Sequence, residues 1–149
     1  MVFNFISVLI PFALFFGLPK VLGSRKYRVL LAAACLVYAV SWYIPSPPID
    51  GRDTAFMTHF FGGGVFCGLL GLYIKLVTNW RAKWYSELAA LYALTSALGV
   101  LNELFEILLY SQGLMPNGIS DTSWDLLANT LGAVTFFAGY TLSRVTWRP

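Results

Sequence analysis

Five long apolar segments constrain the fold of this chain more than any other feature. They cover about residues 2–19, 28–44, 55–76, 85–111 and 123–143. Because an α-helix rises about 1.5 Å per residue, helices of these lengths match a hydrocarbon core of roughly 30 Å. Hydrophobic residues make up 58% of the chain and charged residues only 11%, which excludes an ordinary soluble domain. The segments predict an all-α, polytopic membrane protein with five transmembrane helices in a single membrane domain, residues 1–149.

The basic residues are distributed unevenly between the two sides of these segments. Nine of the ten would share one side, namely Lys20, Arg25, Lys26, Arg28, Lys75, Arg81, Lys83, Arg144 and Arg148, and only Arg52 would lie on the other. Because Lys and Arg in short loops are retained in the cytoplasm, we expect the N-terminus outside and the C-terminus inside. We therefore expect these basic residues to contact membrane lipids, and we expect no nucleic-acid partner.

Small residues are concentrated in the last three segments. They are Gly62, Gly63, Gly64, Gly68 and Gly71 in the third segment, Ala89, Ala93 and Ala97 in the fourth, and Ala128 and Gly132 in the fifth. Small residues four apart allow helix backbones to approach each other in lipid. We therefore expect these three helices to form the core and the first two to face lipid. Packing within one chain is a simpler interpretation than a homodimer contact, and the oligomeric state stays open.

The polar residues of the last three segments share one depth, near the predicted outer ends. They are His59 in the third segment, Asn102, Glu103, Glu106 and Tyr110 on one face of the fourth, and Asp121, Asp125 and Asn129 on one face of the fifth. Acids inside a membrane are costly, and they usually pair or line a wet cavity. Carboxylates gathered at one place therefore share a proton, bind a cation or pair with a charged histidine.

Three interpretations of this polar group stay open. In the first it is a binding or processing site, in which His59, Glu106 and Asp125 are catalytic and the other five residues, Asn102, Glu103, Tyr110, Asp121 and Asn129, bind substrate. In the second it holds a divalent metal such as zinc, manganese or calcium, with His59, Glu103, Glu106 and Asp125 as ligands. In the third it is a hydrogen-bonded network that only fixes helix packing. The sequence contains no HExxH motif and no second histidine that would favour the metal.

Three motifs, taken together, resemble a known family. They are Asp53-x-x-x-x-x-His59-Phe60, Glu103-x-x-Glu106, and Asp121-x-x-x-Asp125-x-x-x-Asn129-x-x-Gly132. Their order is similar to that in the VanZ-like group of small bacterial membrane proteins and the related YjdF-like group, over roughly residues 50–140. Glu106 stands where the VanZ-type pattern usually has Gln, which favours the YjdF-like group. The resemblance implies a multi-pass protein of the bacterial cell envelope, in the cytoplasmic (inner) membrane.

We therefore expect a membrane protein with a polar His/Glu/Asp pocket at its extracytoplasmic side. The pocket would bind or process an amphipathic lipid or a lipid-linked envelope molecule, with Glu106 and His59 as the central acid-base pair. The alternative is a noncatalytic structural or assembly subunit. A proton- or ion-coupled carrier is disfavoured, because the acids cluster at one depth. The sequence does not decide whether the protein is an enzyme.

Overall fold

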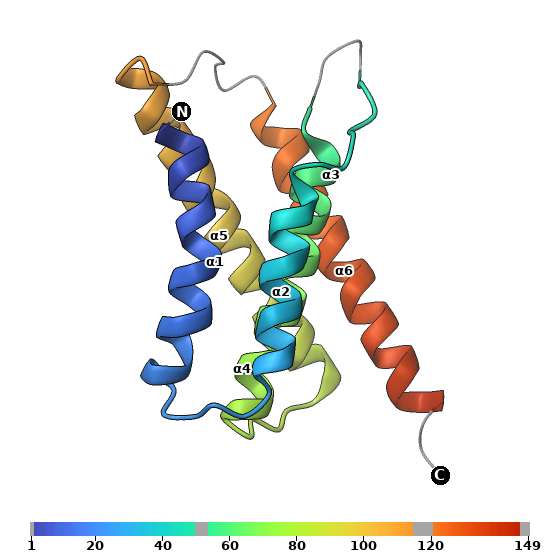
Figure 1. Cartoon of the computed structure of the whole chain (residues 1–149). Coiled ribbons are helices and arrows are strands. Elements are labelled where there is room, and N and C mark those ends of the chain that lie inside the picture. Colours follow the sequence, from blue (N-terminus) through green and yellow to red (C-terminus); the bar gives the residue numbers. More distant parts are fainter. Residues whose placement is uncertain (1, 50–53, 115–120, 147–149) are drawn as a thin grey trace.

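The computed structural model describes residues 2–49, 54–114 and 121–146 (Figure 1). Its helices are α1 (Val2–Val21), α2 (Arg28–Ser41), α3 (Phe56–Thr58), α4 (Phe66–Val77), α5 (Trp84–Ser111) and α6 (Thr122–Thr146). A π-helix, η1 (His59–Val65), connects α3 to α4 in one continuous span. The described residues form no β-strand, which confirms the all-α fold class for this part of the chain.

Three of the described helices are long and apolar enough to cross a membrane. They are Phe56–Val77, which combines α3, η1 and α4, then Trp84–Ser111, and Thr122–Arg144. α2 is apolar but has only 14 residues, and it ends at Ser41 where a helix to residue 44 was expected. The chain leaves the helix there because the backbone N–H of Tyr43 bonds to the carbonyl of Val40 and Pro45 follows. The structure thus supports a membrane protein.

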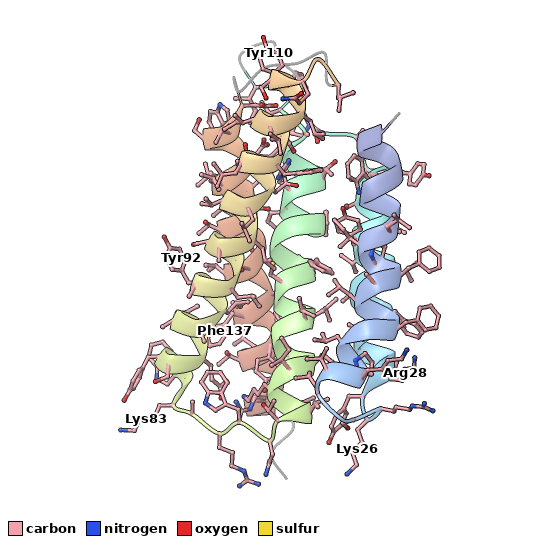
Figure 2. The ribbon with its side chains drawn as sticks, turned by 90° about the vertical axis from the view of Figure 1, so that its left-hand side faces the viewer. Lys26, Arg28, Lys83, Tyr92, Tyr110 and Phe137 are labelled. Atoms are coloured by element: carbon pink, nitrogen blue, oxygen red, sulfur yellow. The ribbon has the colours of Figure 1, made fainter. Side chains whose placement is uncertain are left out.

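The connections between helices gather at two opposite ends of the bundle. The α1–α2 loop, the α4–α5 loop and the C-terminal end of α6 lie together at the bottom of Figure 1, and the end of α5 and the start of α6 lie at the top. Figure 2 shows Lys26, Arg28 and Lys83 at the lower end and Tyr110 at the upper end. We call the lower end the basic end, and the upper end, which carries Glu103 and Asp125, the acidic end. Arg52 and Arg148 lie outside the described residues.

α2 belongs to the core of the bundle, which corrects the expectation that the first two segments only face lipid. Leu31 and Ala34 of α2 are fully buried and pack in one cluster with Phe66 and Cys67 of α4. The run of glycines at residues 62–64 explains this burial, because α2 and α6 both pack against it. A Cβ added to Gly62 would collide with the Ser41 hydroxyl of α2, so glycine allows α2 to approach from the side opposite α6. α1 packs against α2 and keeps exposed aromatic side chains.

The π-helix η1 replaces the α-helix predicted for this stretch. π-helices are rare, usually interrupt an α-helix for about one turn, and are frequent at functional sites. η1 packs against α6 more extensively than any other pair of described elements does. A Cβ added to Gly64 would come within 2.6 Å of the Gly132 Cα and the Ala133 backbone nitrogen. Glycine at both positions therefore allows the two backbones to touch, as small residues do in membrane helices.

Candidate functional site at the acidic end

Three ionisable side chains from three different elements meet at the acidic end. His59 is the first residue of η1, Glu103 lies in the last third of α5, and Asp125 lies in the first turn of α6. One nitrogen or oxygen atom from each side chain lies within 4.8 Å of the corresponding atoms of the other two. The His59 Nε2 and the Asp125 Oδ1 are 3.5 Å apart. We call these three residues the acidic-end cluster.

The turn before α3 fixes the height at which His59 enters the bundle. Ala55 has a positive φ of 47°, and the backbone N–H of His59 donates to its carbonyl oxygen. The backbone N–H of Met57 donates to the Ser46 Oγ at 2.9 Å, which caps the start of the span from the preceding loop. The Thr58 hydroxyl donates to the Ser41 carbonyl at the end of α2. These contacts hold the imidazole next to α5 and α6.

Both carboxylates of the cluster are buried, yet one oxygen atom of each has no hydrogen-bond donor. Glu103 is 5% exposed and Asp125 is 2% exposed. Among the described residues, no donor reaches the Glu103 Oε1 or the Asp125 Oδ1. An unsatisfied buried acceptor costs about 1–3 kcal/mol, and more if it is charged. Two such oxygen atoms within reach of one histidine form a place where a donor or a cation would be stabilised.

Asn129 extends this polar group one turn deeper along α6. Its carboxamide lies between two glycines, because a Cβ on Gly63 would overlap the Asn129 Oδ1 and a Cβ on Gly99 would lie 3.0 Å from the Nδ2. Asn129 is buried, and its Oδ1 also lacks a donor within the described part of the chain. The sequence placed Asn129 on the same face as Asp125, and the structure brings both side chains to the junction of η1, α5 and α6.

The structure brings Glu103 to His59 and Asp125. From the sequence both Glu103 and Glu106 were expected in the site, with Glu106 as the central partner of His59. Residues three apart on an α-helix differ by roughly 60° in direction, since each residue turns the helix by about 100°. Glu106 therefore faces Asn102, whose Nδ2 donates to the Glu106 Oε1 at 2.7 Å. Both side chains are half-buried and border the cluster.

The remaining expected site residues, Tyr110 and Asp121, are more exposed than Glu103 and Asp125. Tyr110 is 48% exposed, at the upper end in Figure 2. Asp121 is half-buried, and its backbone carbonyl accepts the N–H groups of Trp124 and Asp125 at the start of α6. Asp53, which belongs to the first motif of the family resemblance, lies outside the described residues. Of the eight expected site residues, three form the acidic-end cluster. Asn102, Glu106 and Asn129 lie next to it.

A second charged group lies at the basic end, and sequence reasoning missed it. The Lys75 Nζ lies 2.5 Å from the Glu87 Oε1, and the Arg144 Nη1 lies 3.5 Å from the Glu87 Oε2. The Lys75 ammonium also donates to the Tyr140 hydroxyl at 3.1 Å. We call these four residues the basic-end network. The available signal was Glu87, an acid inside the fourth apolar segment at the end that carries the cations.

The basic-end network differs from the acidic-end cluster in being internally paired. A cavity of about 150 Å³ lies beside it, lined mainly by apolar residues of α4, α5 and α6. Within the described part of the chain, no oxygen atom of Glu87 is left buried without a donor, in contrast to Glu103 and Asp125. Among the described residues, buried carboxylate oxygen atoms without a donor are therefore found at the acidic end, which we take as the candidate functional site.

Comparisons of the chain with protein-family models, with curated proteins and with solved structures find no match.

Proposed function

We propose that this chain is a multi-pass protein of the bacterial cytoplasmic membrane whose acidic end binds or processes an amphipathic envelope molecule. The ligand would be a phospholipid or a lipid-linked precursor, with its polar head at the acidic-end cluster and its chains in the surrounding lipid. The proposal includes five membrane crossings, with the N-terminus outside and the C-terminus inside. The acidic end then faces the extracytoplasmic side, as the positive-inside rule requires when the cationic loops are cytoplasmic.

One observation carries the proposal, namely the unpartnered oxygen atoms of Glu103 and Asp125 beside His59. Ionisable groups in a membrane usually pair with each other, as Lys75 and Glu87 do at the basic end. Ionisable groups that stay unpaired inside a bundle typically mark a ligand or ion site. The 3.5 Å separation of the His59 Nε2 and the Asp125 Oδ1 also allows these two groups to exchange a proton with a bound hydroxyl.

Two further observations support the proposal. His59 and Asp125 are each the fourth residue of their spanning helices, at the acidic end of the bundle, which in this proposal is the side of the lipid headgroups. The π-helix begins at His59, and such helices are frequent at functional sites. The similarity of the three motifs to the VanZ-like and YjdF-like groups is consistent with a small protein of the cell envelope, and we include membership of that family in the proposal.

The first test measures thermal midpoints of the purified protein with short-chain lipids. Dihexanoyl phosphatidylethanolamine, phosphatidylglycerol and phosphatidic acid, together with undecaprenyl phosphate, are added separately in one detergent. A ligand that binds only the native state adds about 2.7 kcal/mol of stability at a hundredfold excess over its Kd. At least one lipid should raise the midpoint of the wild type in a saturable way. Asp125→Asn and His59→Gln should lose this increase.

The matched control for this test is Tyr110→Phe. Its hydroxyl was expected in the site, but the side chain is largely exposed, so this variant should respond to lipid as the wild type does. Equal lipid stabilisation of the wild type and of Asp125→Asn would contradict a headgroup site in the cluster. Absence of stabilisation by every lipid would favour the alternative role, in which the polar group only fixes helix packing in a structural or assembly subunit.

The second test addresses the orientation of the bundle. Single cysteines at Pro47 and Gln112, both exposed, should react with a membrane-impermeant thiol reagent added to intact spheroplasts. A cysteine at Ala82, in the α4–α5 loop, should react only after permeabilisation. The wild type is the control, because Cys35 and Cys67 lie within helices. Labelling at Ala82 in intact spheroplasts would reverse the orientation and move the site to the cytoplasmic side.

A further inference from the structure

We propose that His59, Glu103 and Asp125 together hold one divalent transition-metal ion, with Zn²⁺ or Mn²⁺ as the fitting species. The three side chains come from three elements, and their donor atoms lie within 4.8 Å of one another. Zinc binds nitrogen and oxygen at about 2.0–2.2 Å, which places two ligands of a tetrahedral site roughly 3.3–3.6 Å apart. The His59 Nε2 and the Asp125 Oδ1 are 3.5 Å apart, which lies within this range.

The charge balance gives a second and independent argument. The two carboxylates carry two negative charges, and a divalent cation neutralises both while a neutral imidazole completes the set. Among the described residues, the Lys and Arg side chains that pair with an acid all pair with Glu87, at the opposite end. Within the described ranges, the buried carboxylate oxygen atoms without a donor are the Glu103 Oε1 and the Asp125 Oδ1. A metal ion would satisfy both at once.

The donor set also selects among metals. Calcium and magnesium prefer oxygen ligands only, and magnesium demands near-octahedral geometry, so an imidazole disfavours both. Imidazole with carboxylates suits zinc and manganese. Glu106, one of the four ligands expected from the sequence, does not belong to the three residues whose donor atoms lie within 4.8 Å of one another, and its Oε1 accepts the Asn102 amide. Three protein ligands leave at least one coordination position open, as in catalytic zinc sites.

The open coordination position would allow the metal ion to bind the headgroup of the ligand. This part of the inference rests on the proposed function. Two carboxylates alone would repel an anionic headgroup. A bound divalent ion cancels their charge and offers a Lewis acid to a phosphate oxygen atom of the ligand. Phosphate-containing amphiphiles are therefore the substrate class that this site fits. Zwitterionic or neutral headgroups without an accessible phosphate would gain much less from the metal.

The test uses the full chain in detergent, stripped of metal with a chelator and then titrated with ZnCl₂, MnCl₂ or CaCl₂ alone. Calorimetry and elemental analysis should give one Zn²⁺ or Mn²⁺ per chain, with calcium much weaker. His59→Gln, Glu103→Gln and Asp125→Asn should each weaken zinc binding at least about tenfold, the lower limit seen even for residues that only support a ligand. Glu106→Gln is the matched control, one turn away on α5, and should bind zinc as the wild type does.

Two measurements keep this test decisive. Metal-free Asp125→Asn should melt at or above the midpoint of the metal-free wild type, because the substitution removes one of two neighbouring buried carboxylates, so lost binding cannot be attributed to unfolding. Absence of stoichiometric binding to the stripped wild type, or unchanged binding by all three ligand variants, would overturn the inference. Because no lipid is present, metal binding can succeed while the lipid test fails, in which case only the headgroup role is lost.

Discussion

Replacing Gly64 by alanine should lower the thermal midpoint of the protein in detergent by about 6–12 °C. The added Cβ would meet the Gly132 Cα and the Ala133 backbone nitrogen at 2.6 Å, and backbone atoms cannot rotate away as side chains can. Overpacking costs about 1–3 kcal/mol and occasionally more, and rigid backbone neighbours place this variant near 3 kcal/mol. Each kcal/mol corresponds to roughly 2–4 °C for a chain of this size. The same change at Gly132, which faces the Phe60 carbonyl, should be equally harmful.

Two other glycines provide matched controls for this prediction. A Cβ on Gly71, in the same span, would make only ordinary contacts at 3.8 Å with Leu91 and Leu94, and one on Gly139 of α6 would meet nothing within 4 Å. Alanine stabilises a helix interior relative to glycine by about 0.5–1 kcal/mol, so both controls should melt at or slightly above the wild-type midpoint. If Gly64→Ala melts with these controls, the close packing of η1 on α6 is not present in the protein.

Replacing Lys75 by methionine should destabilise the protein by about 3 kcal/mol, or roughly 6–12 °C in thermal midpoint. The change keeps much of the side-chain volume but leaves the buried Glu87 carboxylate without its nearest cation. Breaking a buried pair from one side typically costs about 3–5 kcal/mol, since the remaining charge stays desolvated. We expect the lower end of that range, because Arg144 still reaches the Glu87 Oε2 at 3.5 Å.

A double variant separates the loss of the pair from the loss of packing. Lys75→Met combined with Glu87→Gln removes both charges and should recover at least half of the lost stability, as a double-mutant cycle would measure. Lys83→Met, an exposed lysine at the same end, should change stability by no more than about 0.5 kcal/mol. A double variant that melts below Lys75→Met alone would show that the ion pair is not the reason for the destabilisation.

The helical segments of this fold could be predicted from the sequence because they depend on composition over long windows. Apolar stretches and proline-rich or polar connections locate the helices to within a few residues, as the agreement for α5 and α6 illustrates. The polar residues of the last three segments could be placed at one depth for the same reason, since depth follows directly from position along a helix. His59, Glu103 and Asp125 were all among the expected site residues.

The remaining features depend on how each helix is rotated about its axis and on which helices it contacts. A single sequence specifies neither. Glu103 and Glu106 lie on overlapping faces of α5, and only the position of α6 decides which of them meets Asp125. The π-helix η1 contains Gly64, where the backbone of α6 approaches closely, and the glycine run in the sequence indicates close packing but not a π-helix. The burial of α2 follows from contacts with the other side of that run. The sequence places Lys75 among the cations of the loop between the third and fourth segments, whereas in the structure its ammonium pairs with Glu87.

The positions of the two charged groups determine how the protein responds to membrane voltage. Glu87 lies in the first turn of α5 and Glu103 in its last third, and sixteen residues of helix separate them by about 24 Å. Between these ends, residues 60–74, 88–102 and 126–143 of the three spanning helices contain no Lys, Arg, Asp, Glu or His. A transmembrane potential does work on charge that moves within the hydrocarbon layer, about 2.3 kcal/mol per elementary charge per 100 mV. The distance of about 24 Å between the two groups is shorter than a hydrocarbon layer of roughly 30 Å, so in a membrane at least one of them would lie within that layer. Movement of charge at that group would then be coupled to the transmembrane potential.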